Sequence, residues 1–442
     1  MTELGKLLRS AASPLTGGAA DFDPLMRVVG NANLVLLGEA SHGTHEFYCA
    51  RALITKRLMT EKGFCAVLAE ADWPDSYRVN RYVQGAPGDA DAEAALSDFE
   101  RFPQWMWRNA DLLDFVGWLR SHNDGLNRDA QKVGFYGLDL YSLHASMAAV
   151  VDYLTAVDPP SARRARRHYA CFDHFGGPVQ SYGLAAGLGL APSCEAGVVR
   201  ELTELRLHAA DYLMHDGVSA QEALFCAVQN AKVVKNAEQY YRSMFRANVS
   251  SWNLRDQHMM DTLVALLEHH QRQQRPAKMV VWAHNSHLGD ARATAMHERG
   301  ELNLGQLVRE RFGREALSVG FTTHHGTVTA ASDWDGPAER KAVRLALPES
   351  YEAAFHAAGI SNFMVDFTRH PELALALDKR RLERAISVIY RPQSERSIHY
   401  FGAHLPRQFD VVLYYDETRA VEPLERTAPP VAELQETYPS GF

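Results

Sequence analysis

Long apolar runs are missing from this sequence, and this absence sets the first limits. No stretch approaches the about 18 consecutive apolar residues of a membrane span. The opening segment, MTELGKLLRSAASPL, has no apolar core, so no signal peptide is expected. Cysteine is also scarce: the 442 residues contain five cysteines, an odd number, with no CxxC pair. We therefore expect no disulfide framework, no cysteine-cluster zinc site, and a reducing, cytoplasmic location.

An excess of positive charge is lacking too. Lys and Arg number 46 against 54 Asp and Glu, which gives a net charge of −8. Nucleic acids and anionic membranes attract clustered positive charge, so neither is an expected partner. Disorder is excluded as well, because 46% of the residues are hydrophobic and only 23% are charged. The length fits one large α/β domain with a helical insertion, or two domains.

Short continuous apolar runs recur along the chain and predict buried strands. The predicted strands are Asn33–Gly38, Cys65–Ala69, Lys132–Leu138, Lys278–Ala283, Ala316–Thr322, Asn362–Phe367, Ala385–Tyr390 and Phe409–Tyr415. Helical spacing follows the first of them over Thr44–Lys62. Strands that alternate with helices are typical of a mainly parallel sheet covered on both faces. The sequence therefore predicts a three-layer α/β/α fold with a mainly parallel central sheet and a large helical insertion.

The insertion is predicted where helical patterns dominate. Its predicted helices are Leu143–Val157, Ala162–Tyr169, Ala196–His215, Ala220–Phe245 and Asn253–Gln274. Glycine and proline in Phe172–Ser193 predict a loop, and Thr323–Asp335 predicts a short hairpin. The expected organisation is a helical segment at 1–32, the first part of the α/β core at 33–140, an insertion forming a lid or substrate wall at 141–277, and the second part of the core at 278–442.

Titratable side chains follow the ends of several predicted strands. Glu39 and His42 lie in GEASHG after the first strand, and Glu70 follows the second. His284 and His287 lie in WAHNSH after a much later strand. Open α/β sheets bind ligands outside the carboxyl ends of their strands, so these groups are expected to share one site. If the first two strands are neighbours, about 5 Å apart, the two glutamates converge.

An imidazole flanked by carboxylates has the chemistry needed to activate water. A neutral histidine accepts a proton, and a carboxylate on its other nitrogen fixes the tautomer. Arg51, on the next predicted helix, would keep a carboxylate ionised or bind an oxyanion; it is equally a solvated surface arginine. Asp139 follows a further strand in the same way. The alternative for all these strand-end residues is a structural one, as helix caps or partners of buried backbone groups.

Several reaction classes lack their motifs. There is no G-x-S-x-G elbow, no P-loop and no G-x-G-x-x-G after the first strand, so neither a serine esterase nor a nucleotide cofactor is indicated. A metal is the competing interpretation. His42 with His45, and His284 with His287, show H-x-x-H spacing, and nearby acids could complete a divalent-ion site. No H-E-x-x-H motif fixes such a site, so no metal and no cofactor are predicted.

Together these segments resemble the erythromycin esterase family. The resemblance rests on GEASHG with Glu46, Phe47 and Arg51, on AEADW, on FPQWMWRN and on WAHNSH, and it spans roughly residues 33–416. It implies a three-layer sheet with a helical insertion, a fold shared with a haem-binding lipoprotein type. It also implies metal-independent hydrolysis of a macrolide lactone.

The same resemblance implies roles for individual residues. His42 matches the general base, and Glu39 and Glu70 match the acids that orient or polarise the water. Arg51, His284 and His287 match the remaining catalytic positions. Trp105 in the aromatic motif and Arg255 in SWNLRD lie in matching segments and are expected at the substrate. Asp139, from its strand-end position, and Tyr240, from its place on a predicted helix, are expected there too.

The sequence thus predicts an enzyme that acts on a small-molecule ester or macrolide, and it makes no prediction of oligomeric state. Two alternatives stay open: a haem- or metal-binding protein that uses the same cleft, and a metal-dependent hydrolase with a non-macrolide substrate. Tyr240 has an alternative of its own, since aromatic residues at helical spacing are often plain core.

Overall fold

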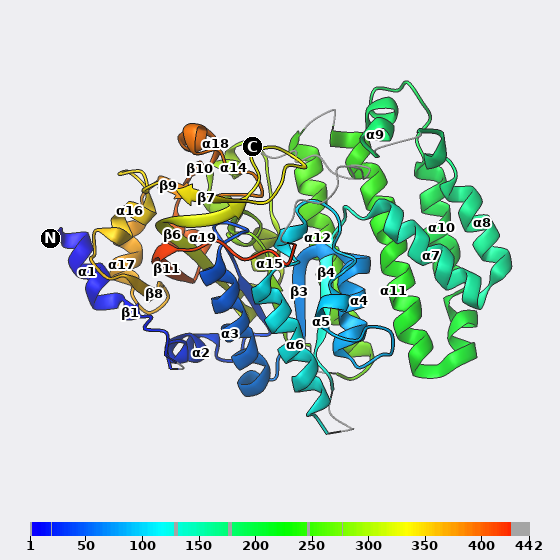
Figure 1. Cartoon of the computed structure of the whole chain (residues 1–442), viewed down its shortest axis with the longest axis horizontal. Coiled ribbons are helices and arrows are strands. Elements are labelled where there is room, and N and C mark those ends of the chain that lie inside the picture. The colour runs from blue at the N-terminus through cyan, green and yellow to red at the C-terminus, as the bar shows by residue number, and fades with distance from the viewer. Residues whose placement is uncertain are drawn as a thin grey trace. The chain divides into compact units, whose positions relative to one another are not determined.

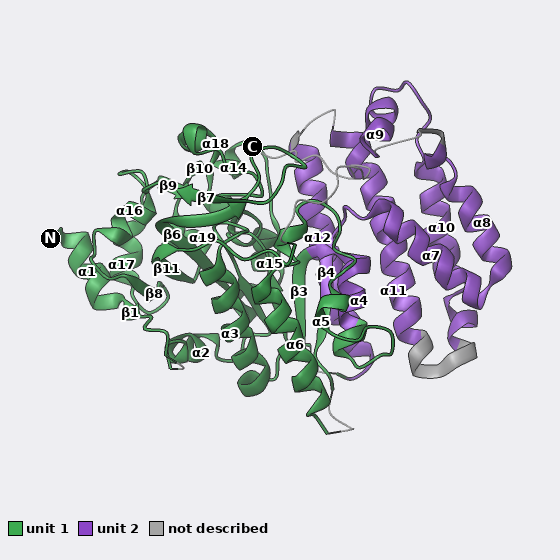
Figure 2. Ribbon diagram, viewed as in Figure 1, with its two compact units in different colours: residues 1–70, 81–135, 275–430 green, residues 71–80, 136–274, 431–442 purple. Residues whose placement is uncertain are grey.

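The structure is a computed structural model that describes residues 2–18, 20–127, 131–175, 179–244, 248–275 and 277–425. It divides into two compact units (Figure 2). Unit 1 comprises Met1–Glu70, Arg81–Phe135 and Arg275–Pro430, and unit 2 contains Ala71–Asn80 and Tyr136–Gln274. Among the described helices, none is both long and apolar enough to cross a membrane.

Most strands belong to one sheet (Figure 1). Its order is β1-β8-β11-β6-β2-β5-β3-β4, and β7 pairs with β6 beside this path. The central pairs β11–β6, β6–β2, β2–β5 and β5–β3 are parallel, whereas β8, β1 and β7 pair antiparallel. The sheet strands are β1 (Ser13–Pro14), β2 (Leu34–Leu37), β3 (Ala66–Asp72), β4 (Gly134–Asp139), β5 (Met279–Trp282), β6 (Ala316–Ala330), β7 (Glu339–Val343), β8 (Asn362–Asp366) and β11 (Val411–Thr418). A separate pair is formed by β9 (Arg381–Arg384) and β10 (Tyr400–Ala403).

Helices cover both faces of the sheet in unit 1. On one face, Phe47 of α3 (His45–Lys62) contacts Phe321 of β6, with ring centroids 5.6 Å apart. Phe115 of α6 (Ala110–Asp124) contacts Trp282 of β5 at 4.8 Å. Side chains alternate along a strand, so Ser318 of β6 faces away from Phe321.

The opposite face packs against the short helix α13 (Asn285–Leu288) and its neighbours α15 (Leu304–Phe312) and α19 (Leu405–Gln408). The Ser318 hydroxyl donates to the Leu288 carbonyl at 3.0 Å. The Phe409 ring lies so close to Gly320 that an added Cβ there would sit 2.7 Å from it. Helix, sheet and helix therefore form the layers, and the predicted α/β class with a mainly parallel central sheet is confirmed.

The remaining helices of unit 1 connect or flank these layers. They are α1 (Glu3–Ala11), α2 (Asp23–Val29), α5 (Ala92–Ala95), α14 (Ala295–Glu298), α16 (Tyr351–His356), α17 (Pro371–Leu377) and α18 (Glu395–Ile398). The helix α4 (Trp73–Val83) begins in unit 2.

Unit 2 is predominantly helical. Its main helices are α7 (Leu143–Val157), α8 (Pro159–Tyr169), α9 (Val179–Gly187), α10 (Glu195–Leu207), α11 (Ala209–Met244) and α12 (Asn248–Arg272). They bury one continuous apolar cluster that includes Val150, Val198 and Tyr241. The predicted bounds of α7 match the structure, whereas the predicted helix Ala196–His215 runs across the junction of α10 and α11.

One loop prediction is wrong. Phe172–Ser193 contains η2 (Phe172–Phe175) and α9. Val179, Tyr182 and Ala186 lie on one face of α9 and are buried in the apolar cluster of unit 2. Tertiary packing of this face outweighs the poor helix propensity of the glycines.

A disulfide joins Cys171 to Cys194 at the two ends of this segment, with Cα atoms 5.8 Å apart. The cysteine spacing does not predict the pair, because 23 positions of sequence separate residues that α8 and α10 bring together. A reducing compartment therefore loses its support from cysteine usage, and the cytoplasmic location stays a prediction.

One strand prediction is also wrong. Ala385–Tyr390 is not a strand of the sheet, and only isolated bridges join it to Ser41 and Ala331. Its backbone bonds reach the loop after β2, with the Ile386 N–H donating to the Ala40 carbonyl at 2.8 Å. The apolar run is buried because it covers this loop. The hairpin predicted at Thr323–Asp335 forms part of a longer one, in which Gly326 of β6 pairs with Val343 of β7.

Gly43 is the tightest point of the loop after β2, so Gly43→Ala should strongly destabilise unit 1. Its carbonyl accepts from the N–H groups of Thr329 and Val421, both at 3.0 Å. An added Cβ would lie 1.9 Å from the Thr329 carbonyl oxygen, which belongs to backbone and cannot swing away. We expect a loss of about 3 kcal/mol in the free energy of unfolding, measured by urea denaturation.

The control is Gly117→Ala in the middle of α6, where an added Cβ meets nothing within 4 Å. Alanine favours the helix, so this variant should gain about 0.8 kcal/mol. Equal stability of the two variants would contradict the close approach at Gly43.

Candidate active site

The site forms where three strands of the sheet end. β5 lies between β2 and β3, so the predicted neighbourhood of the first two strands is wrong. Two strand spacings, about 10 Å in all, separate the ends of β2 and β3. The loop after β5, with His284 and His287, fills this interval. Glu39 and Glu70 therefore do not share one point but lie on either side of the histidine loop.

The first group of the site is built around Glu39. The His42 ring places Nδ1 2.9 Å from Glu39 Oε1, and the Arg51 guanidinium places Nη2 2.8 Å from Glu39 Oε2. All three side chains are buried. Since the adjacent cation favours an ionised carboxylate, Glu39 can only accept from His42. The Nδ1 of His42 must then carry the proton, which leaves a lone pair on Nε2 of the neutral ring.

Arg51 reaches the site because α3 packs directly against the sheet. Its guanidinium lies 4.4 Å from the Tyr48 ring centroid and 5.1 Å from that of Trp282. Such rings attract a buried cation and partly replace its hydration. None of its three nitrogens makes a well-aligned hydrogen bond, so the 2.8 Å contact of Nη2 with Glu39 acts as an ion pair. The interpretation of Arg51 as a solvated surface arginine is wrong.

The second group of the site is built around Glu70. One carboxylate oxygen accepts from the backbone N–H of His284 at 2.8 Å, and the other lies 3.2 Å from Nε2 of His287. The His284 ring stands against that of His42, with centroids 4.9 Å apart. The glutamate thus holds both histidines of the loop, one through its backbone and one through its side chain.

His284 is held as a neutral ring. Burial, together with the charge that His42 can carry, lowers the pKa of His284 to about 3. Its Nδ1 accepts from the Ser286 N–H at 3.2 Å, so the ring proton resides on Nε2. That Nε2 makes no well-formed hydrogen bond, and the Ala40 carbonyl is the acceptor near it. A buried donor of this kind can polarise a carbonyl oxygen.

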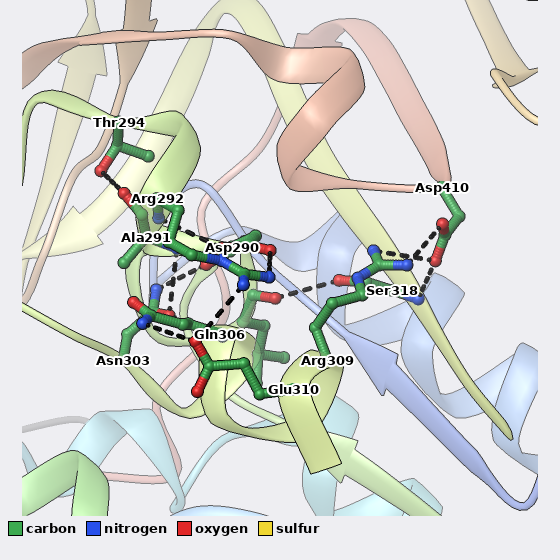
Figure 3. Close-up of polar contacts among 12 residues, drawn as sticks. Asp290, Ala291, Arg292, Thr294, Asn303, Gln306, Arg309, Glu310, Ser318 and Asp410 are labelled. Atoms are coloured by element: carbon green, nitrogen blue, oxygen red, sulfur yellow. Dashed lines mark hydrogen bonds and ion pairs between the residues drawn. The ribbon is translucent and has the colours of Figure 1, made fainter. Parts of the chain in front are cut away.

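A polar clamp holds the loop that follows the two histidines (Figure 3). Asn303, the N-cap of α15, donates to the carbonyls of Ser286 and Gly289 at 2.7 and 2.5 Å. Its Oδ1 accepts from the N–H groups of Ala291 and Gln306 at 3.3 and 2.9 Å. Sequence reasoning missed Asn303, although asparagine before an amphipathic run is an N-cap signal.

Ion pairs continue this clamp in Figure 3. Arg292 forms a two-pronged pair with Asp290, at 2.9 and 2.6 Å. Arg309 pairs with Asp410 at 2.9 and 3.2 Å, and the same carboxylate accepts from the Ser318 N–H. The return from the histidine loop to β6 is thereby fixed at both ends.

The predicted substrate residues fall into both units. Trp105 lies in unit 1, in η1 (Gln104–Met106), where it is buried and its carbonyl accepts from Asn109. Unit 2 contains the other three, and they gather around Tyr141, which sequence reasoning missed. Arg255 donates to both oxygens of Asp139 and lies 4.8 Å from the Tyr141 ring centroid; the hydroxyls of Tyr141 and Tyr240 are 3.2 Å apart. Their role in substrate binding stays a prediction.

The predicted H-x-x-H pair of His42 and His45 is divided between two partners. His42 contacts Glu39, whereas His45 contacts Asp111 at 2.8 Å. Within the described part of the chain, the groups that could hold a metal ion are His45 with Cys49 and Asp111, His324 with His356 and Asp416, and His168 with Glu201 and Glu204. None of these groups contains Glu39, Glu70 or the loop histidines, so the metal alternative at this site gains no support.

Comparison with known proteins bears on this arrangement. The erythromycin esterase family model matches residues 59–418, most of the chain. The chain belongs to the erythromycin esterase family. It is 22% identical over 369 residues to an erythromycin esterase type II of Escherichia coli, covering 80% of this chain and 84% of that protein.

Solved structures share the fold of this erythromycin esterase family member. A succinoglycan biosynthesis protein superposes with a TM-score of 0.76 at 22% identity, covering 95% of this chain and 97% of that one. A protein from Bacillus cereus gives 0.70 at 19% identity, covering 96% and 99%. The erythromycin esterase EreC, a mutant in its open conformation, gives 0.64 at 17% identity, covering 91% and 94%. At these identities the likeness establishes the fold alone.

Family membership supports a hydrolase of the erythromycin esterase type that acts on a small molecule. The matched residues include Glu70, His284 and His287, while Glu39, His42 and Arg51 precede the match. The catalytic roles of all six residues stay predictions.

The neutral state of His284 should make the protein acid-sensitive. Its pKa falls from 6.5 in the unfolded chain to about 3 in the folded one, so below 6.5 the unfolded chain binds a proton that the folded chain does not. The free energy of unfolding therefore decreases as the pH falls, and at pH 5 it is about 2 kcal/mol lower than at neutral pH. Urea unfolding across this range should show a smaller loss for His284→Asn than for the wild type. His297→Asn on the exposed surface is the control, and an equal acid loss in the wild type and His284→Asn would contradict the neutral ring.

Removing the clamp should loosen the histidine loop. Asn303→Asp keeps the acceptor that caps α15 but replaces both donated hydrogen bonds by contacts between oxygens, so about 3 kcal/mol of unfolding free energy should be lost. Gln306→Ala, whose amide reaches only the exposed Glu310, should stay within about 0.5 kcal/mol of wild type. Denaturation curves would contradict the clamp if the two variants matched.

Proposed function

We propose that this protein hydrolyses a carboxylic ester or a macrolide lactone with water activated by His42, and that no covalent intermediate forms. The observation that carries the proposal is the pairing of Glu39 with both His42 and Arg51 inside unit 1. It leaves one imidazole nitrogen as a base and keeps the supporting carboxylate ionised. Membership of the erythromycin esterase family supports the reaction class.

The reaction follows from these groups in two proton transfers. Nε2 of His42 takes a proton from water as the water oxygen attacks the ester carbonyl, and the imidazolium is stabilised by Glu39. The tetrahedral intermediate carries a negative oxygen, for which the Nε2–H of His284 and the Arg51 cation are the proposed partners. His42 then returns its proton to the departing alkoxide. The products are a carboxylic acid and an alcohol, which remain one molecule when a lactone opens; the acid then loses its proton to solvent as a carboxylate.

Glu70 has a supporting role in this proposal. It holds the backbone of His284 and the ring of His287, and so orients the loop that faces His42. The glutamate acts through these histidines rather than on water directly. Removal of its charge should therefore affect the rate less than removal of His42.

A serine nucleophile fits this site poorly. Ser286 Oγ lies 2.8 Å from Nδ1 of His284, which resembles a serine–histidine pair. Burial lowers the pKa of His284 to about 3, and a base this weak cannot draw the proton from a hydroxyl efficiently. The same nitrogen also accepts the Ser286 N–H, as the start of α13 requires. We assign this contact to helix capping.

The substrate side of the proposal is stated for each unit by itself. Trp105 is the proposed contact in unit 1, and Asp139, Arg255 and Tyr240 are the proposed contacts in unit 2. The aspartate and arginine neutralise each other as a two-pronged pair, so this group offers hydrogen bonds rather than net charge. A neutral, polyhydroxylated ester suits such an uncharged group better than a charged one. A cytoplasmic location is kept as part of the proposal.

Loss of His42 should abolish most hydrolysis. His42→Gln keeps a polar side chain but removes the base, so kcat should fall at least about 10²-fold on any ester or macrolide that the wild type cleaves. Product formation is followed by chromatography over a panel of aryl esters and macrolides, with a chelator present and absent. His325→Gln, on β6 away from these contacts, is the matched control and should keep wild-type activity.

Three results would contradict the proposal: no hydrolysis of any panel member, full activity of His42→Gln, or activity that a chelator removes. Rapid mixing tests the absence of a covalent intermediate. An initial burst of alcohol equal to the enzyme concentration would indicate an acyl-enzyme and exclude direct attack by water.

A further inference from the structure

A second cluster of reactive side chains lies at the start of α3 in unit 1. His45 and Cys49 are four residues apart and share one face of this helix. Asp111, in the first turn of α6, reaches the same point from the neighbouring helix. All three are only partly buried: the side chains of His45 and Asp111 are 21% and 11% exposed. The proposed reaction gives this cluster no role.

The spacing of the three groups matches a metal site. Cys49 Sγ lies 3.4 Å from Asp111 Oδ1 and 3.7 Å from Nδ1 of His45, and Nδ1 lies 2.8 Å from the Asp111 carboxylate. A tetrahedral zinc ion with bonds of about 2.3 Å to sulfur and about 2.0 Å to nitrogen and oxygen separates its ligands by about 3.3–3.6 Å. The nitrogen–oxygen distance would need to lengthen, as it must when a hydrogen bond is exchanged for two metal bonds, and the sulfur–nitrogen distance of 3.7 Å would need to shorten slightly.

We propose that His45, Cys49 and Asp111 bind a divalent transition-metal ion of the zinc type. Thiolate, imidazole and carboxylate are the three ligand kinds that zinc takes in proteins, and their partial exposure leaves a fourth position open to water. The site uses a single cysteine, so it differs from the cysteine-cluster type that the sequence excludes. It goes beyond the proposed hydrolysis and does not depend on it.

The protons balance in a simple way. Without metal, the Cys49 thiol donates to Asp111, and the His45 Nδ1–H donates to the same carboxylate. Metal binding releases the thiol proton to solvent and moves the His45 proton from Nδ1 to Nε2. The net change is the loss of one proton, so binding strengthens as the pH rises.

Arg419 is the group that must give way. Its guanidinium donates to Nε2 of His45 in the metal-free state. Once that nitrogen carries a proton, the two groups repel. The Arg419 side chain is 53% exposed and has Glu46 at 3.8 Å and Glu422 at 4.0 Å as other partners. The arginine can therefore turn to either carboxylate without leaving a buried charge unpaired.

Cobalt(II) tests the site directly, because a cobalt–thiolate bond produces a charge-transfer band in the near ultraviolet. The full chain, without an affinity tag and freed of metal with a chelator, is titrated with cobalt(II) and then with zinc. We expect the band to saturate at one ion per chain and to disappear as zinc replaces cobalt. Cys49→Ser should abolish the band, and Asp111→Asn should weaken binding at least about 10-fold.

Cys65→Ser is the matched control, since this buried thiol donates to the Lys278 carbonyl and lies outside the cluster. It should keep the band unchanged. The absence of a thiolate band in the wild type, or its persistence in Cys49→Ser, would overturn the proposal. Circular dichroism shows whether each variant folds. If Cys49→Ser does not fold, the weaker cobalt binding expected of Asp111→Asn is the test of the site. The cobalt titration does not measure hydrolysis, so a negative titration does not contradict the proposed function. A negative hydrolysis assay likewise does not contradict the metal site.

Discussion

The buried ion pair between Arg51 and Glu39 is the interaction on which the site depends. Two charges removed from water cost several kcal/mol each unless their pairing is close. Here the 2.8 Å contact, the rings of Tyr48 and Trp282 and the His42 N–H together offset that cost. Burial and the charge of Glu39 raise the pKa of Tyr48 well above its usual value, so this neighbour adds no charge. The pair fixes the His42 tautomer, because an ionised carboxylate can only accept.

The order of the strands turns two separate acids into one site. β5 separates β2 from β3, so its exit loop stands between Glu39 and Glu70 and is contacted from both sides. His284 is buried there as a neutral ring, between a histidine that can become charged and a carboxylate. Asn303 secures the far end of the loop with four hydrogen bonds from one amide. His42 lies beside the charged pair of Glu39 and Arg51, whereas His284 is a neutral ring held by hydrogen bonds. The two histidines therefore have different chemistry.

Unit 2 also contains a carboxylate at the end of a strand, and this carboxylate is paired. Asp139 is the last residue of β4, and Glu70 lies near the end of β3. The Asp139 carboxylate accepts hydrogen bonds from both Nε and Nη2 of Arg255. Tyr141 and Tyr240 complete a group without net charge. Glu70 thus supports two histidines, whereas Asp139 pairs with an arginine, as Glu39 does with Arg51.

The sequence alone determined what depends on local pattern: most of the apolar strands, their mainly parallel arrangement, the bounds of α7, and the titratable residues near the strand ends. Tertiary structure decided the position of β5 between β2 and β3, the burial of Arg51, the helix α9 within a glycine-rich segment, and the Cys171–Cys194 bond. The apolar run Ala385–Tyr390 shows what a local pattern leaves undetermined. Its pattern is that of a strand, but its partner is the loop after β2. Periodicity and strand ends are properties of a few consecutive residues. Strand order, charge burial and long-range pairing depend on which distant segments meet, and this information is spread over the whole chain.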